Sequence, residues 1–528
     1  MKTKILKVIA TLLLLLLLKS CNKNPIIIPE YVVSVKNASK NNAPSLQSFA
    51  HGFSGSEWLL FAGRTNSKDS LNGGLHNLNG NYAQTSFTPP SFNENIFVYN
   101  VSTDKKPISI SITELVNRVK TNCSTFSEGL PYQQTACYKL NEALNNNLSV
   151  FKNSNALVKQ VGEYLYVIGG YGAIDFKNPS KGYTTYNQVA KINVRLLIQL
   201  VKGKKTLVET EWVDLMRFGK SKSLVSTGGE LQYINGTFYL VGGHNFGKSA
   251  ANFGGQKYVD ALYPFSLKEN KGNSSLLDVK LSVPITDVTN PTDSIADNIS
   301  IFRRRDGPIL PSIYKSPVSG KIAEGIAIYA GVFKPGNDNN LQAWNDAIYI
   351  HPQWANKESK LFTYDKSYNQ NNYNVYAAPS FVAFDSITEV SHSFLLGGIG
   401  DGPEKDYNNE LSGFTNSGMH IKTNVGEYPL KSKNSIFNEN IFKEKSNNIP
   451  PFYGAEAILF PNQNITYSKH SSEIIDINTS FSDKKEIVVG YIFGGIEAFQ
   501  SNPGTYGKRN SRASNQIWEV TLTKNSLN

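Results

Sequence analysis

Short apolar segments that end in a small residue and a glycine recur along the chain. Each contains three or four apolar residues, the length of a short buried strand, and glycine at its end tolerates close packing and a positive φ. The six segments are Trp58–Gly63, Leu165–Gly170, Phe238–Gly243, Ile326–Gly331, Phe394–Gly398 and Tyr491–Gly495. The pattern predicts one type of strand that is repeated six times and ends each time in a tight turn.

A second strand follows each glycine segment, and in most copies Asn or Asp opens it. These strands are Asn95–Asn100, Asn187–Ile192, Asp260–Tyr263, Asp346–Ile350, Met419–Lys422 and Asn515–Val520. Another strand precedes the glycine segment, most clearly in Leu231–Leu240, where Asn235-Gly236 is the signal of a type I′ hairpin. We expect Thr206–Val213 and Leu276–Val283 to supply outer fourth strands. Repeated four-stranded antiparallel units predict an all-β fold, a six-bladed β-propeller with long loop insertions.

The two ends of the chain are expected to meet in this fold. The last unit stops one strand short, and Tyr31–Val35 is a strand with no blade of its own. We expect this N-terminal strand to pair as the outer strand of the sixth blade and close the ring, which removes an exposed edge. The propeller would occupy residues 31–525, with insertions near 103–149, 284–305 and 402–448. The first insertion contains two helix-like segments, 112–119 and 138–144.

The N-terminus has the pattern of an export signal. Lys2, Lys4 and Lys7 precede an apolar stretch over 8–18, and Leu18-Lys19-Ser20-Cys21 resembles a lipobox. Residues 1–20 would then be a lipoprotein signal peptide, Cys21 the lipidated residue and 21–30 a tether. The alternative is an uncleaved signal anchor. The lipoprotein interpretation predicts a protein held to the outer membrane by acyl chains, with its periplasmic or surface orientation left open.

Charge and cysteine content agree with export. The formal net charge of +11 is spread over the chain without basic runs beyond Arg303–Arg305, so nucleic-acid binding is not expected. Cys123 and Cys137 both lie in the first insertion. In an oxidising compartment we expect them to form a disulfide, with two free thiols as the alternative.

Particular phrases carry a resemblance to a known family. They are Gly63–Asn66 with Gly74–His76, Gly169–Gly172, Phe302–Asp306 and Gly490–Ile496. With their hairpin partners they resemble kelch repeats, and the chain is similar to the kelch-type β-propeller lipoproteins of Gram-negative bacteria, especially Bacteroidota. That group has no settled activity, so the resemblance implies a fold and a location rather than a reaction.

The candidate binding face collects polar and aromatic residues from several units. In a propeller the loops after the second strand and those before the first strand emerge on one face, around the mouth of the channel. Its candidate ligand-binding residues are Arg64, Asn66, His76, Tyr171, His244, Asn245, Arg303, Arg304, Glu497 and Arg512. Such a mixture suits a glycan, a peptide or a carboxylate. The alternative is that these side chains line a wet channel and tie neighbouring blades together.

Two classes of enzyme with a kelch-type fold can be compared with this chain by the residues that each requires. Copper radical oxidases need a thioether between cysteine and tyrosine and two histidine ligands. Neither Cys123 nor Cys137 lies in a blade strand, and the seven histidines are scattered singly, so neither a metal site nor a cofactor is expected. A sugar-acting enzyme similar to the sialic acid mutarotases needs no metal and stays open.

These observations favour a membrane-anchored binding or scaffold protein. It would be a subunit of an outer-membrane assembly or a surface receptor for protein or glycan, and no catalytic residue is assigned. A rigid ring that positions variable loops is well suited to binding.

Overall fold

The computed structural model describes residues 30–66, 87–124, 135–204, 207–247, 255–287, 300–335, 341–352, 361–368, 377–399, 414–438, 441–442, 452–498 and 511–525. The expected signal peptide, Cys21 and His76 lie outside the described residues. Within these ranges, no helix has both the length and the apolar character needed to cross a membrane.

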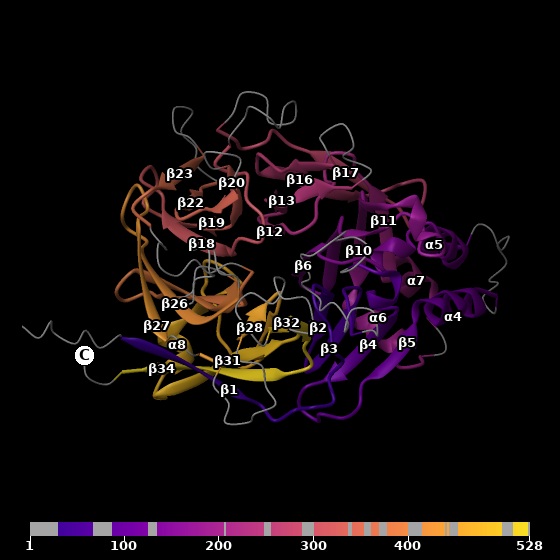
Figure 1. Ribbon diagram of the computed structural model, residues 1–528, viewed down its shortest axis with the longest axis horizontal. Helices are drawn as coiled ribbons and strands as arrows, with labels where there is room; N and C mark the ends of the chain where they lie inside the picture. Colours follow the sequence, from indigo (N-terminus) through magenta and orange to yellow (C-terminus); the bar gives the residue numbers. More distant parts are fainter. Residues whose placement is uncertain are drawn as a thin grey trace, which may run out of the picture.

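Six sheets surround a common centre (Figure 1). We number them sheet 1 to sheet 6 in chain order and give their strands from the centre outward. Sheet 1 contains β2 (Ala50–Ser54), β3 (Glu57–Phe61), β4 (Asn95–Asn100) and β5 (Ile108–Ser111). Sheet 2 contains β6 (Leu157–Val161), β7 (Tyr164–Ile168), β10 (Gln188–Asn193) and β11 (Met216–Lys220). Sheet 3 contains β12 (Glu230–Ile234), β13 (Thr237–Val241), β16 (Tyr263–Glu269) and β17 (Leu277–Leu281).

The second half of the chain repeats the plan with one addition. Sheet 4 contains β18 (Ile309–Lys315), β19 (Ile322–Tyr329), β22 (Ala347–Ile350) and β23 (Phe362–Asp365). Sheet 5 contains β24 (Ser380–Asp385), β25 (Val390–Ile399), β26 (Phe414–Asn424) and β27 (Ser432–Asn438), with β30 (Ile474–Asp476) added parallel to β24. Sheet 6 contains β29 (Ile458–Pro461), β31 (Glu486–Phe493), β34 (Ile517–Lys524) and β1 (Tyr31–Asn37). The result is an all-β, propeller-like arrangement.

Strand β1 joins the start of the described chain to its end. It pairs antiparallel with β34 from Tyr31↔Lys524 to Asn37↔Trp518. Tyr31, Val33 and Val35 are buried in this pairing, so alternate residues of β1 face the core. The predicted pairing of the N-terminal strand with the outer edge of the last sheet is present.

The small-residue doublets that end the glycine segments have the left-handed conformation that the sequence predicted. At all twelve positions φ lies between +50° and +102°. The doublets are Ala62-Gly63, Gly169-Gly170, Gly242-Gly243, Ala330-Gly331, Gly397-Gly398 and Gly494-Gly495. The predicted hairpin at Asn235-Gly236 also has positive φ at both residues, as a type I′ turn requires.

These doublets also connect neighbouring sheets. In four of the six doublets the second residue donates its backbone N–H to a carbonyl that precedes the first strand of the next sheet. The bonds run from Gly63 to Asn153 at 2.7 Å, from Gly170 to Ser226 at 3.0 Å, from Gly243 to Arg304 at 2.8 Å and from Gly495 to Leu46 at 2.8 Å. The last of these links sheet 6 to sheet 1.

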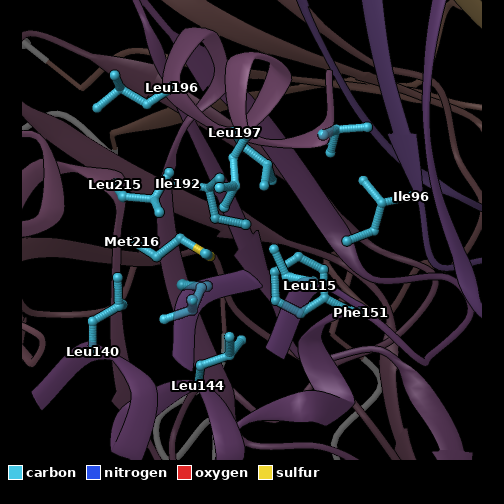
Figure 2. Close-up of a cluster of buried hydrophobic side chains, with 14 of the residues drawn as sticks. Ile96, Leu115, Leu140, Leu144, Phe151, Ile192, Leu196, Leu197, Leu215 and Met216 are labelled. Atoms are coloured by element: carbon cyan, nitrogen blue, oxygen red, sulfur yellow. The ribbon is translucent and has the colours of Figure 1, made fainter. Parts of the chain in front are cut away.

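Helices cover the outer side of sheets 1 and 2. They are α4 (Ile112–Ser124), α5 (Ala136–Asn145), α6 (Val194–Val201) and α7 (Glu209–Leu215). Figure 2 shows Leu115, Leu140, Leu144, Leu196, Leu197 and Leu215 of these helices gathered with Ile96, Phe151, Ile192 and Met216 in one buried cluster. Cys123 of α4 and Cys137 of α5 form the predicted disulfide. The helix-like segments 112–119 and 138–144 are confirmed.

One predicted strand was wrong. The expected outer strand over Thr206–Val213 is replaced by α7, and β11 is the outer strand of sheet 2. Trp212 and Leu215 are both buried, because their spacing of three places them on one helical face against the cluster. The expected strand over Leu276–Val283 is present as β17.

The range 402–448 was expected to be an insertion. It contains β26 and β27, so much of it belongs to sheet 5.

Small sheets are formed by the loops between second and third strands, joined in sheet 6 by β28 (Phe452–Ala455), which precedes the inner strand β29. They are β8 (Tyr171–Ala173) with β9 (Tyr183–Thr185), β14 (His244–Phe246) with β15 (Gln256–Tyr258), β20 (Val332–Pro335) with β21 (Leu341–Ala343), and β28 with β32 (Ile496–Ala498) and β33 (Ser511–Ala513). A last helix, α8 (Ile477–Phe481), follows β30.

Candidate functional site

A ring of six residues surrounds one end of the central channel. Each precedes the first strand of its sheet by two or three positions, and each has a left-handed backbone. The residues and their φ angles are Ser48 (50°), Asn155 (56°), Gly228 (67°), Asp306 (54°), Ala377 (52°) and Glu456 (59°). We call this set the channel ring.

Backbone hydrogen bonds connect the channel ring from one sheet to the next. The N–H groups of Asn155, Gly228, Asp306, Ala377 and Glu456 donate to the carbonyl of the preceding ring residue, at 3.2, 3.1, 3.0, 2.6 and 2.9 Å. Between the last and the first member the link is made by side chains, since Ser48 Oγ donates to Glu456 Oε2 at 2.6 Å. The ring is therefore a rigid platform to which all six sheets contribute.

The channel ring borders a cavity of about 230 Å³. Glu230, at the start of β12, lines the same cavity. Three acidic residues therefore line this space, Glu230, Asp306 and Glu456.

Glu456 is the most highly connected of these acids. Its Oε2 accepts hydrogen bonds from Ser48 Oγ and from Asn155 Nδ2, the latter at 3.1 Å. Burial raises the pKa of the Glu456 carboxyl from 4.5 to about 7, and the negative charge of Asp306 acts in the same direction. The hydrogen bond from Ser48 and the charges of Arg305 and Arg64 oppose this increase in pKa. Glu456 can therefore hold or release a proton near neutral pH.

The other two acids differ in their partners. Asp306 forms an ion pair with Arg305 Nε at 2.9 Å, but burial still raises its pKa above the ordinary value. The side chain of Glu230 faces the channel, where desolvation by the surrounding protein raises its pKa to about 7; the charge of Lys159 opposes this increase and those of Glu456 and Asp306 add to it. The site thus combines an ion-paired acid with two acids whose pKa values lie near neutrality.

In sheets 1, 2 and 3 the loop before the first strand lies beside the loop after the second strand. Isolated backbone bridges join Gln47 to Arg64, Ser154 to Tyr171 and Thr227 to His244, so segments before the first strand meet segments after the second. Arg64 is buried, its Nε donates to Gln47 Oε1 at 2.9 Å, and its guanidinium lies 4.1 Å from the ring centre of Phe87.

Tyr171 and His244 belong to packed aromatic groups at the same face. Tyr171 contacts the rings of Phe87, Tyr183 and Phe246. His244 is buried and its Nδ1 lies 3.2 Å from Gln256 Nε2. Burial, together with the charge of Arg305, holds the pKa of His244 well below its usual range, so this imidazole is neutral at physiological pH.

The arginines of the 303–305 cluster have different surroundings. Arg304 is 1% exposed, pairs with Asp346, and donates from Nε to Ile301 O at 2.7 Å and from Nη1 to Ala330 O at 2.8 Å. The guanidinium of Arg304 therefore binds other groups of the protein, namely the Asp346 carboxylate and two backbone carbonyls. The Arg303 guanidinium lies 4.3 Å from the ring centre of Tyr258.

The remaining predicted residues tie loops together. Arg512 Nε donates to the buried Glu497 carboxylate at 2.6 Å, and Ser514 Oγ donates to its other oxygen. Asn66 exchanges two hydrogen bonds with the backbone of Ala513, at 2.9 and 3.0 Å. Asn245 lies in β14 opposite Lys257.

Sequence reasoning missed Ser48, Asn155, Glu230 and Glu456. Their common signal is a polar residue zero to two positions before an inner strand, which is indistinguishable from an ordinary turn until the sheets are assembled. In the described ranges, no group of three or more His, Cys, Asp or Glu residues is arranged to hold a metal ion.

Comparisons with known proteins add little to this geometry. No protein-family model and no curated protein sequence matches the chain. Among solved structures, a structure of YjhT is similar, with 12% identity, a TM-score of 0.38, and coverage of 92% of this chain and 99% of that chain.

Proposed function

We propose that this protein is a lipid-anchored, six-bladed kelch-like β-propeller of the outer membrane that binds a hydroxyl- or amine-bearing ligand, such as a glycan, at the channel ring. In this proposal the six sheets are the blades, and the pairing of β1 with β34 closes the ring. An outer-membrane partner protein would contact the loops around the same face.

The membrane anchor is supported by two features. The sequence at Leu18–Cys21 resembles a lipobox, and residues 21–30 would connect the lipid to β1. The disulfide between Cys123 and Cys137 is a bond typical of oxidising compartments outside the cytoplasm.

The observation that carries the binding proposal is the left-handed channel ring. Five of its six members are not glycine, and each such residue costs about 1 kcal/mol or more in this conformation. Strained residues of this kind persist where the surrounding structure fixes them, and they cluster at binding and active sites. Here they direct Ser48, Asn155, Asp306 and Glu456 toward one cavity.

The chemistry of the ring favours a ligand that donates hydrogen bonds. Carboxylates accept such bonds, and sugar hydroxyl or amino groups donate them. An anionic ligand would meet three carboxyl groups, and Arg304, which the sequence offered as a partner for it, is engaged by Asp346. The carboxylate ligand considered from the sequence is therefore disfavoured at this ring.

Three matched sugars test the proposal. Glucosamine, glucose and glucuronate share a ring and differ in charge, and saturation-transfer NMR on the purified mature protein compares their binding. We expect glucosamine to bind best and glucuronate worst, and Glu456→Gln to weaken glucosamine binding. The control Glu427→Gln changes an exposed glutamate and should have no effect. Preferred binding of glucuronate, or no effect of Glu456→Gln, would contradict the proposal.

A sugar-acting enzyme is the second candidate function, and the pKa of Glu456 favours it. A carboxyl group with a pKa of about 7 can donate or accept a proton at neutral pH, and Asp306 offers a second, ion-paired carboxylate nearby. The test is anomer exchange of a freshly dissolved sugar, followed by proton NMR. Acceleration that Glu456→Gln abolishes would support catalysis, whereas rates equal to buffer would leave binding alone.

A further inference from the structure

The other end of the channel opens into a larger cavity, of about 1070 Å³. It is lined by inner strands of the six sheets and by their turns, including Gly55, Gly162 and Asn235-Gly236. We call this the far cavity. It adjoins the cavity at the channel ring, since six residues line both spaces, Glu230 and His51 among them, but none of the six ring residues lines the far cavity.

One wall of the far cavity is a segment that the repeat does not require. Residues 462–485 connect β29 to β31, and within them β30 adds to the inner edge of sheet 5 through pairs such as Val382↔Ile474. Ile474, Ile475, Ile477 and Phe481 are buried, so the segment is fixed to the body of the protein. Asp476 also caps α8, accepting from the Thr479 N–H at 2.9 Å.

Polar groups from three sheets meet this wall inside the cavity. Lys159 of sheet 2 pairs with Glu473 of the wall, and its Nζ also lies 3.1 Å from Gln232 Oε1 of sheet 3. Glu324 of sheet 4 lies close enough to Glu473 and Lys159 for the charges of both to affect its pKa. Burial raises the pKa of Glu324 above its ordinary value. The cavity therefore offers a charged donor and several acceptors on different sides.

Aromatic side chains line the same space. Phe53, Tyr233 and Tyr467 come from sheet 1, sheet 3 and the wall, and each is half-buried. Gln463, at the start of the wall, adds an amide. Rings that supply apolar area beside amides, carboxylates and an ammonium group match the alternating faces and hydroxyls of sugars.

We propose that the far cavity binds a linear oligosaccharide of neutral or amino sugars. The volume is at the upper end of the range for small-ligand sites, which suits several linked sugar rings. The carboxyl groups of Glu230, Glu324 and Glu473 outnumber the ammonium group of Lys159, which disfavours an acidic saccharide. This site lies outside the channel ring and does not depend on the function proposed there.

Calorimetric titration of the mature protein with three tetrasaccharides tests the site. The probes are the tetramers of N-acetylglucosamine, glucosamine and galacturonic acid. We expect saturable binding of the first two, and binding of the acidic tetramer at least about tenfold weaker. Glu324→Gln and Gln463→Ala should each weaken binding by about tenfold, which corresponds to one lost hydrogen bond to a charged group or a lost amide contact. Glu427→Gln, on the exposed surface, is the matched control.

Several results would overturn the proposal. They are the absence of saturable binding of both non-acidic tetramers, tighter binding of the acidic tetramer, and equal affinity in the wild type, Glu324→Gln and Gln463→Ala. Circular dichroism and a thermal melt of each variant separate lost binding from lost folding. Binding of monosaccharides at the channel ring is tested with Glu456→Gln, whereas binding in the far cavity is tested with Glu324→Gln and Gln463→Ala. Failure of one proposal is therefore distinguishable from failure of the other.

Discussion

Replacing Gly169 by alanine tests whether the glycine doublets hold the sheets together. Gly169 has φ of +65°, and a Cβ added to it would lie 2.1 Å from the carbonyl oxygen of Ser226. That oxygen accepts the hydrogen bond from the Gly170 N–H at 3.0 Å, which connects sheet 2 to sheet 3. The methyl group cannot be accommodated unless this connection moves apart.

The expected cost has two parts. An alanine in the left-handed region costs about 1 kcal/mol. Separating the sheets leaves a buried donor and acceptor poorly paired, which costs about 1 to 3 kcal/mol, and the displaced packing adds to it. We therefore expect Gly169→Ala to lower the free energy of unfolding by about 3 to 5 kcal/mol.

Gly162 provides the matched control. Its φ is +58°, but a Cβ there would meet nothing within 4 Å, so Gly162→Ala should cost only the backbone term of about 1 kcal/mol. Equilibrium urea unfolding, followed by tryptophan fluorescence, measures both variants against the wild type. Equal losses in the two variants would refute the reasoning, because the close contact with Ser226 would then contribute nothing.

Four further predictions address the anchor, the chain ends, the channel ring and the Arg304 cluster. Cys21→Ala should move the protein from the membrane to the soluble fraction, as seen by fractionation and mass spectrometry of the lipid; a lipid-free variant that stayed in the membrane would contradict the anchor. Deleting 22–36 removes β1, exposes the edge of β34 and should lower the melting temperature, whereas an unchanged melt would exclude a role in closure. The raised pKa of Glu456 means that the folded protein holds a proton that the unfolded chain releases, so stability should fall as the pH rises from about 4.5 to about 7, and less steeply in Glu456→Gln; parallel urea midpoints across this range would argue against it. Arg304→Ala strands the buried carboxylate of Asp346 and should destabilise the fold by about 3 to 5 kcal/mol while glucosamine binding by the folded protein is unchanged; the opposite pattern would return Arg304 to the ligand site.

Local sequence patterns were sufficient to predict most strands. The hairpin at Asn235-Gly236 and the glycine doublets depend on backbone conformations that few residues adopt, so the residue type itself carries the information. The helix α7 was missed for the opposite reason. Its apolar residues fit a strand or a helix equally well, and burial of Trp212 against the other helices decides between them.

The site could not be predicted in the same way. Asn155 and Glu456 are 301 positions apart in sequence and are joined by a hydrogen bond only after six sheets are assembled. Arg304 was predicted to bind a ligand because arginine suits ligand recognition. Nothing in the local sequence revealed that Asp346 would form an ion pair with it. Charge is readable from a sequence, whereas the partner that neutralises it is a tertiary property.

The glycine doublets and the channel ring are connected by backbone hydrogen bonds. A doublet N–H binds the carbonyl two positions before a ring residue of the next sheet, as Gly63 does at Asn153, Gly170 at Ser226 and Gly495 at Leu46. These bonds hold the segment that turns into the left-handed ring residue, so the backbone of the ring is fixed from outside. This backbone position accepts different side chains, since Ser, Asn, Asp, Ala and Glu occupy equivalent positions, while the side chains of Ser48 and Glu456 also join the first and last members of the ring. A backbone joint that recurs between sheets can thus present a channel mouth whose chemistry differs from one sheet to the next.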